Sequence, residues 1–199
     1  MTSTVGIVGA GAAGTAATKA LRASGVDVEL FSRTGEQPSN RTLVNKGVAI
    51  GLLEPHQAAL PDVGVEPTAD TVRSIDPRTR EVRLDSGERR AFDALLIATG
   101  SRPRTLDEEV IGRDQAISGG RLTTLHSAAD AVRVRDLLAT TKPARVLMLG
   151  GGLVASETAS LLTDAGHEVT LASVDGGAVP IDPVSLKTPV IQMGWTNKR

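Results

Sequence analysis

The sequence contains no cysteine among its 199 residues. A disulfide scaffold, a thiolate zinc site, iron–sulfur ligation and a cysteine nucleophile are therefore excluded, and any redox chemistry requires a cofactor. The sequence also has no excess of either charge, because 22 Lys and Arg against 23 Asp and Glu leave a net charge of -1. This balance gives no electrostatic reason to expect nucleic acid or an anionic membrane as a partner.

Long apolar runs are missing as well, since none approaches the roughly 18 to 20 residues that cross a bilayer. An apolar strand pattern begins by about Thr4, which leaves no space for a signal peptide before it. The histidines His56, His126 and His167 are scattered without metal-ligand spacing, so we expect structural or surface roles and no metal site. The sequence contains no GxSxG element, the motif that usually indicates a hydrolase. We expect a soluble, cytoplasmic protein.

An internal repeat organises the chain. Aligning residue n with residue n + 141 superposes TVGIVGAGAAGTAATKALRASGVDVELFSR on ARVLMLGGGLVASETASLLTDAGHEVTLASV. Each copy predicts a strand, a Gly-rich turn, a helix, a glycine and a second strand. The runs VGIVG and RVLMLG are typical of parallel strands buried on both faces, and the helices are expected from Ala12 to Ser24 and from Leu153 to Ala165. Two such strand–helix–strand units imply two nucleotide sites.

Other patterns separate the copies. Short alternating segments with turn signals predict a small antiparallel meander from Thr68 to Phe92, followed by a buried parallel strand from Ala94 to Ala98. A polar, turn-rich stretch then suggests a domain crossing, and a helical period runs from Ser127 to Leu138. The predicted class is α/β, with a Rossmann-type sheet and meander over 1–110, an incomplete second Rossmann unit over 111–178, and an irregular tail over 179–199.

The Gly-rich turns carry the candidate nucleotide sites. GxGxxG between a strand and a helix lets the chain turn tightly, brings backbone N–H groups to a pyrophosphate and packs the helix on the sheet. The first site is assigned to Gly9, Ala10, Gly11, Ala13 and Gly14. The second is assigned to Gly150, Gly152 and Ala155, whose small side chain is permitted at the third position.

Both copies depart from the usual acidic residue at the end of the second strand, where they place Ser32 and Ser173. A hydroxyl still hydrogen-bonds ribose, though more weakly than a carboxylate. Arg33 beside Ser32 suits either a 2′-phosphate or an ordinary exposed position. No arginine neighbours Ser173, so the choice between NAD and NADP stays open.

Four motifs together resemble the FAD-dependent pyridine nucleotide oxidoreductases, in the branch of ferredoxin reductases and apoptosis-inducing factors. They are GAGAAG at Gly9, SNRTLVNKG at Ser39, FDALLIATGSRPR at Phe92 and GGGLVASE at Gly150. The resemblance implies that NAD(P)H gives hydride to FAD and that the flavin reduces an acceptor such as a ferredoxin-like protein. The absence of cysteine sets aside the branches that pass electrons through thiols.

The resemblance also implies residue roles. It places Arg41 beside FAD and Lys46 near the flavin N5, and it pairs Lys46 with Glu157, the two candidate catalytic residues. The Ala98-Thr99-Gly100 stretch resembles the motif whose backbone passes close to FAD. Val72 falls where the family's meander contacts adenine through its main chain.

The pattern stops near Ala178, which suggests a truncated chain, a split gene or a frameshifted tail. We count three parallel strands for the first unit and two for the second, which would leave apolar strand edges open to self-association. Two alternatives stay open: a non-catalytic dinucleotide-binding remnant, and a flavin-free NAD-dependent dehydrogenase.

Overall fold

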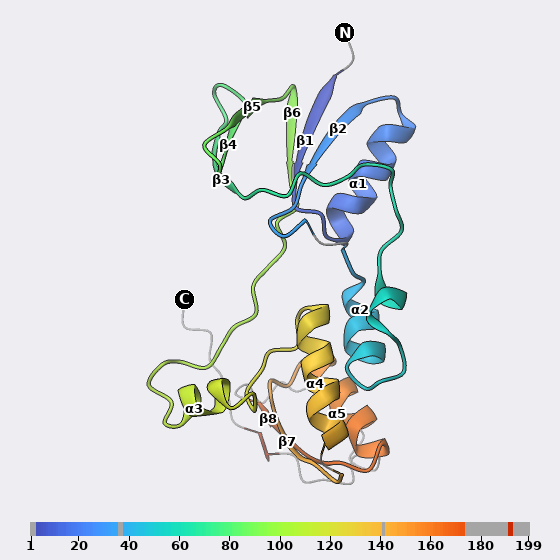
Figure 1. Ribbon diagram of the computed structural model, residues 1–199, viewed down its shortest axis with the longest axis vertical. Helices are drawn as coiled ribbons and strands as arrows, with labels where there is room; N and C mark the ends of the chain where they lie inside the picture. Colours follow the sequence, from blue (N-terminus) through green and yellow to red (C-terminus); the bar gives the residue numbers. More distant parts are fainter. Residues whose placement is uncertain (1–2, 36–37, 141, 174–190, 193–199) are drawn as a thin grey trace. The chain divides into compact units, whose positions relative to one another are not determined.

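Figure 1 shows the computed structural model, which describes residues 3–35, 38–140, 142–173 and 191–192. The chain divides into two units. The first unit comprises Met1–Asn40 and Ala59–Arg102, and the second comprises Arg41–Ala58 and Pro103–Arg199. The segment 41–58 thus interrupts the first unit in sequence and belongs to the second.

The first unit is built on a parallel sheet of three strands in the order β2-β1-β6. The central strand β1 (Thr4–Val8) pairs with β2 (Asp27–Phe31) on one side and with β6 (Ala94–Ile97) on the other. Helix α1 (Ala12–Ala23) packs on this sheet, and Ile7 between them is 0% exposed. The continuous run VGIVG is therefore a strand covered on both faces, as the sequence predicts.

The meander of the first unit consists of β3 (Val72–Asp76), β4 (Glu81–Leu84) and β5 (Arg89–Ala91), paired antiparallel in that order. The only two phenylalanines of the chain, Phe31 and Phe92, meet edge-to-face with ring centroids 5.8 Å apart in the cluster beneath it. An ion pair also fastens the meander to β2, because Arg90 Nη1 lies 3.1 Å from Glu29 Oε1. Side chains thus hold the two sheets together.

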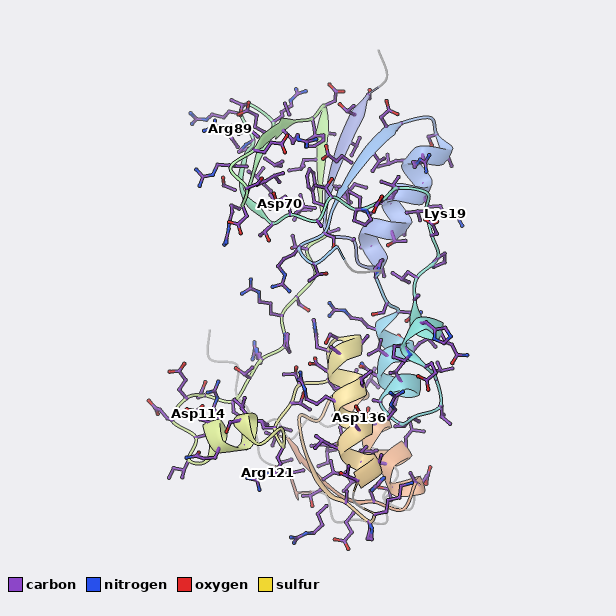
Figure 2. All side chains as sticks on the ribbon, viewed as in Figure 1. Lys19, Asp70, Arg89, Asp114, Arg121 and Asp136 are labelled. Atoms are coloured by element: carbon purple, nitrogen blue, oxygen red, sulfur yellow. The ribbon has the colours of Figure 1, made fainter. Side chains whose placement is uncertain are left out.

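The turn that leads into the meander is fixed by Asp70, labelled in Figure 2. Its carboxylate accepts hydrogen bonds from the backbone N–H groups of Thr71 and Ser86. Hydrogen bonding, foremost from the Ser86 side chain, holds the pKa of Asp70 below its ordinary value. The loop before Val72 is therefore anchored by a carboxylate that favours its charged form.

The second unit repeats the strand, turn, helix and strand with β7 (Arg145–Leu149), α5 (Leu153–Asp164) and β8 (Glu168–Ser173). Its sheet has the order β7-β8-β9, in which β9 (Ile191–Gln192) pairs in parallel with β8. Among the described residues, β7 thus has a neighbour on one side only. Leu147 and Leu149 are accordingly 63% and 49% exposed, whereas the equivalent strand of the first unit is central and buried.

The other helical elements of the second unit are α2 (Arg41–Leu43), the π-helical turn η1 (Val44–Val48), the 3₁₀ turn η2 (Pro55–Ala58), α3 (Arg113–Ser118) and α4 (Ala128–Thr140). Val44 and Val48 are buried against Ala131 of α4. Helix α4 starts with a reciprocal cap, because the Asp130 N–H donates to Ser127 Oγ while Asp130 Oδ2 accepts from the Ser127 N–H.

The predicted α/β Rossmann-type class is confirmed, and each predicted helix of the repeat lies within one residue of its expected bounds. The crossing between units falls at Arg102, before the division expected at residue 110. Within the expected irregular tail over 179–199, the structure describes only β9, a third and short strand where the count from sequence gave two. No helix in the described ranges is long and apolar enough to span a membrane.

Candidate functional site

The first nucleotide site is the turn between β1 and α1. The Gly9 N–H donates to Phe31 O at 2.9 Å, which ties the turn to the end of β2. Gly9 has φ +112°, and a Cβ built there would lie 2.3 Å from Ala98 O. A Cβ at Gly14 would lie 1.9 Å from Gly9 O. Only glycine fits at these two positions, because rigid backbone occupies the space of a side chain.

The middle glycine of the turn faces open space. Gly11 caps α1 with extended backbone, φ -70° and ψ -171°, and an added Cβ would meet no atom within 4 Å. The first turn of α1 contains no acidic side chain. A helix N-terminus that presents N–H groups to open space is suited to bind an anion such as a pyrophosphate.

The remaining first-site candidates lie at the carboxyl ends of the strands or beside them. The Ala98 N–H donates to Val8 O at 2.8 Å, which brings the Ala98-Thr99-Gly100 stretch against the Gly9 turn. Half-buried Ser32 donates its N–H to Thr68 O, and Arg33 is exposed. These positions match the edge of an open α/β sheet where ligands bind.

The last three candidates of the first unit are Val72 on the meander and the two alanines of the Gly-rich turn, Ala10 and Ala13. Val72, at the start of β3, packs on the core cluster that contains Phe31. Ala10 is buried beneath the turn, while Ala13 is exposed on the first turn of α1. The structure gives Val72 a packing role, and its expected main-chain contact with adenine stays a prediction.

The second site has the same local shape with less support around it. The Gly150 N–H donates to Ala172 O at 2.8 Å, as Gly9 does to Phe31, and Gly152 caps α5 with φ -78° and ψ 174°. Neither Gly150 nor Gly152 has an atom within 4 Å of an added Cβ among the described residues. Ala155 lies half-buried in the first turn of α5. Ser173 ends β8, and its side chain lies outside the described part of the chain.

Lys46 and Glu157 meet, although 111 residues separate them in sequence. Lys46 Nζ lies 2.7 Å from Glu157 Oε1, and the side chains are 47% and 43% exposed. The turn η1 supplies the lysine and the second turn of α5 supplies the glutamate, two elements that pack against each other within the second unit. The pairing expected from the resemblance is thus present in the structure.

Arg41, expected beside FAD, contacts His126 in the second unit. Its Nη1 lies against His126 Nε2, which must accept because a guanidinium only donates. Burial, followed by the charge of Arg41, lowers the pKa of His126. Burial opposes ionisation of Asp130, but hydrogen bonds from Ser127, Thr124 and His126 outweigh it and lower the pKa of Asp130. Burial and the charge of Arg41 thus favour the neutral form of His126, while the charge of Asp130 favours the protonated form.

Sequence reasoning missed several participants. The contact between His126 and Arg41 has no local signal, because 85 residues separate them. Ser127-Ala128-Ala129-Asp130 has the spacing of a capping box and could have placed the start of α4. Asn45 and Ser156, each one residue before a member of the ion pair, were also passed over. No group of His, Asp and Glu side chains in the described residues could hold a metal ion.

A protein-family model described as pyridine nucleotide-disulphide oxidoreductase matches residues 3–177. The ferredoxin–NAD(+) reductase component of the biphenyl dioxygenase system of Paraburkholderia xenovorans is 32% identical over 181 residues, covering 86% of this chain and 42% of the relative. The ferredoxin reductase component of chlorobenzene dioxygenase from a Cupriavidus species is 34% identical over 180 residues, with the same coverage. The chain thus spans about 42% of the length of these curated relatives.

Solved structures show the same fold. Putidaredoxin reductase, crystallised in a covalent complex with putidaredoxin, matches with a TM-score of 0.79 and 24% identity over 96% of this chain and 49% of that one. A ferredoxin reductase from Rhodopseudomonas palustris matches with a TM-score of 0.77 and 21% identity, over 99% of this chain and 53% of its own. At these identities the likeness establishes the fold.

Proposed function

Because the chain belongs to the pyridine nucleotide-disulphide oxidoreductase family, we propose that it serves an FAD-dependent NAD(P)H oxidoreductase reaction. FAD, when bound, supplies a flavin that takes hydride from NAD(P)H and releases electrons to an acceptor. The named relatives reduce ferredoxins, so the acceptor we propose is a small ferredoxin-like electron carrier. A cytoplasmic location belongs to the same proposal.

The residues of the first unit fit the pyrophosphate of FAD. Gly9 and Gly14 leave no space for a side chain, while Gly11 faces open space, which is where we propose that the pyrophosphate binds. The backbone N–H groups at the start of α1 would hold the phosphates, and the Ala98-Thr99-Gly100 stretch would line the cofactor. Ser32 would bind ribose. The turn from Gly150 to Ala155 would bind NAD(P)H in the same way.

The observation that carries the proposal is the pairing of Lys46 with Glu157. Two Gly-rich turns fit any dinucleotide protein, including a flavin-free dehydrogenase, whereas this pair joins two motifs that the resemblance connects with the flavin. We propose that Lys46 supplies a cation that favours the reduced, anionic flavin, and that Glu157 holds its ammonium group.

Lys46→Met in the FAD-loaded chain tests this proposal. Loss of a cation that contributes about 1 to 3 kcal/mol would lower the two-electron potential by roughly 20 to 60 mV, measured by spectroelectrochemistry. Lys19→Met is the matched control, because Lys19 lies on the outer face of α1 (Figure 2) and is exposed. Equal potentials for Lys46→Met and the parent would remove Lys46 from the flavin site.

The second candidate function is nucleotide binding without turnover. Its support is the apolar outer side of β7, where Leu147 and Leu149 are 63% and 49% exposed in the described part of the chain. The absorbance of the purified chain between roughly 350 and 500 nm separates the two functions. Bound yellow flavin favours the oxidoreductase, and colourless protein that still binds adenine nucleotides favours this second function.

A further inference from the structure

Two buried oxygens of the second unit, Asn45 Oδ1 and Ser156 Oγ, have no hydrogen-bond partner in the described part of the chain. Ser156 is only 8% exposed. The large majority of buried side-chain polar atoms in proteins are paired with protein or ordered water, because an unpaired atom loses its hydration and gains no hydrogen bond in exchange. These two oxygens therefore require an explanation.

Their position supplies one. Asn45 directly precedes Lys46 on η1, and Ser156 directly precedes Glu157 on α5. These two elements pack against each other and are joined by the 2.7 Å contact between Lys46 Nζ and Glu157 Oε1. Each member of the ion pair thus has a buried, unpaired oxygen one residue before it on its own element.

The ion pair needs such support. Both of its side chains are nearly half exposed, and exposed pairs contribute little because water screens the charges and long side chains resist ordering. The lysine also stands on a π-helical turn, closed by the Ala49 N–H on Val44 O, a local geometry that is frequent at functional sites. The lysine keeps one position only if η1 is fixed against α5.

We propose that Asn45 and Ser156 are positioning residues for the Lys46–Glu157 pair, and that one buried water bridges Asn45 Oδ1 and Ser156 Oγ between η1 and α5. A water with two or more polar partners is an ordinary component of protein interiors. The bridge fixes the register of η1 on α5, and thereby holds the ammonium group on the carboxylate. The importance of this position for redox chemistry rests on the proposed function, but the bridge itself does not.

The test measures how fast an amine-acylating reagent modifies Lys46 in the full chain without nucleotide, read by mass spectrometry. Lys142, exposed in the same unit, is the internal reference. Glu157→Gln sets the rate of a released lysine, roughly two- to fivefold above the parent. Ser156→Ala and Asn45→Leu should each reach at least half of that increase. Ser156→Thr, which keeps the hydroxyl, should stay at the parent rate.

Two comparisons separate positioning from general loosening. Ser160→Ala removes a half-buried hydroxyl one turn further along α5 and should change nothing. The double variant with Asn45→Leu and Ser156→Ala should not exceed the faster single variant, because both changes remove one bridge.

Parent-like labelling of Ser156→Ala, additive rates in the double variant, or equal increases at Lys46 and Lys142 would each overturn the proposal. Flavin binding, titrated on the same samples, reports on the proposed function separately. A chain that binds no flavin still shows whether Asn45 and Ser156 hold the pair.

Discussion

Two glycines of the first turn, Gly11 and Gly14, should respond in opposite ways to substitution. In Gly14→Ala the new Cβ would lie 1.9 Å from Gly9 O, where an ordinary contact needs at least 3.4 Å. The obstacle is a backbone atom, so the turn itself must move by about 1.5 Å. In Gly11→Val the backbone angles suit any residue and no atom lies within 4 Å of the Cβ. The fold accepts this second change.

The two variants should therefore separate stability from binding. Forced backbone movement costs roughly 1 to 3 kcal/mol, which for a unit of this size lowers Tm by about 5 to 20 °C in Gly14→Ala. Gly11→Val loses only the N-cap preference of glycine, under about 1 kcal/mol. Its isopropyl group, however, fills the approach to the N–H groups. Losing two charge-assisted hydrogen bonds of roughly 1.5 to 3 kcal/mol each weakens FAD binding by about 100-fold or more.

Calorimetry gives the Tm of each variant, and FAD titration followed by quenching of flavin fluorescence gives the affinity. Gly152→Val, the equivalent change in the second unit, is the matched control and should leave FAD affinity at the parent value. Parent-like FAD affinity in Gly11→Val would show that the first turn is not the FAD site. An unchanged Tm in Gly14→Ala would refute the steric argument.

Two further predictions concern the second unit. Because burial and then Arg41 lower the pKa of His126 from 6.5, the unfolded chain binds the proton first, and stability should fall as pH drops below about 6.5 and level off below the folded pKa. His126→Asn should flatten this step in pH-dependent melts, whereas His56→Asn, on an exposed side chain, should not. Hydrogen exchange should be faster over 144–173 than over 3–100, because β7 has one strand neighbour among the described residues whereas β1 has two. Equal protection of the two ranges would contradict this second prediction.

The repeat could be predicted from sequence because its physical causes are local. A parallel strand covered on both faces needs a continuous apolar run, and a glycine that follows a helical pattern marks the end of the helix in the sequence. The expected Lys46–Glu157 pairing came from motif resemblance, and the structure contains it. Periodicity alone would have missed it, since a three-residue helix followed by a π-helical turn has no regular period.

The assignment of 41–58 to the second unit could not be predicted, because it depends on packing between distant segments. Val44 and Val48 are buried against Ala131, and Ile50 packs on the cluster around Leu162 of α5. The local sequence of this segment does not indicate which of the two units it packs in. The exposure of Leu147 could not be predicted either, because RVLMLG and VGIVG have the same apolar pattern while the strands beside them differ.

The two Gly-rich turns show how one motif can be held with unequal rigidity. Gly9 and Gly150 share a left-handed region of φ, at +112° and +125°, and both donate to the end of the neighbouring strand. Gly9 is also pressed against the backbone of Ala98, which continues from a strand on the other side of β1. Gly150 has no such neighbour among the described residues. Within the described residues the first turn is therefore held by strands on both sides and the second by one, so we expect a ligand of the second turn to supply more of the order on binding.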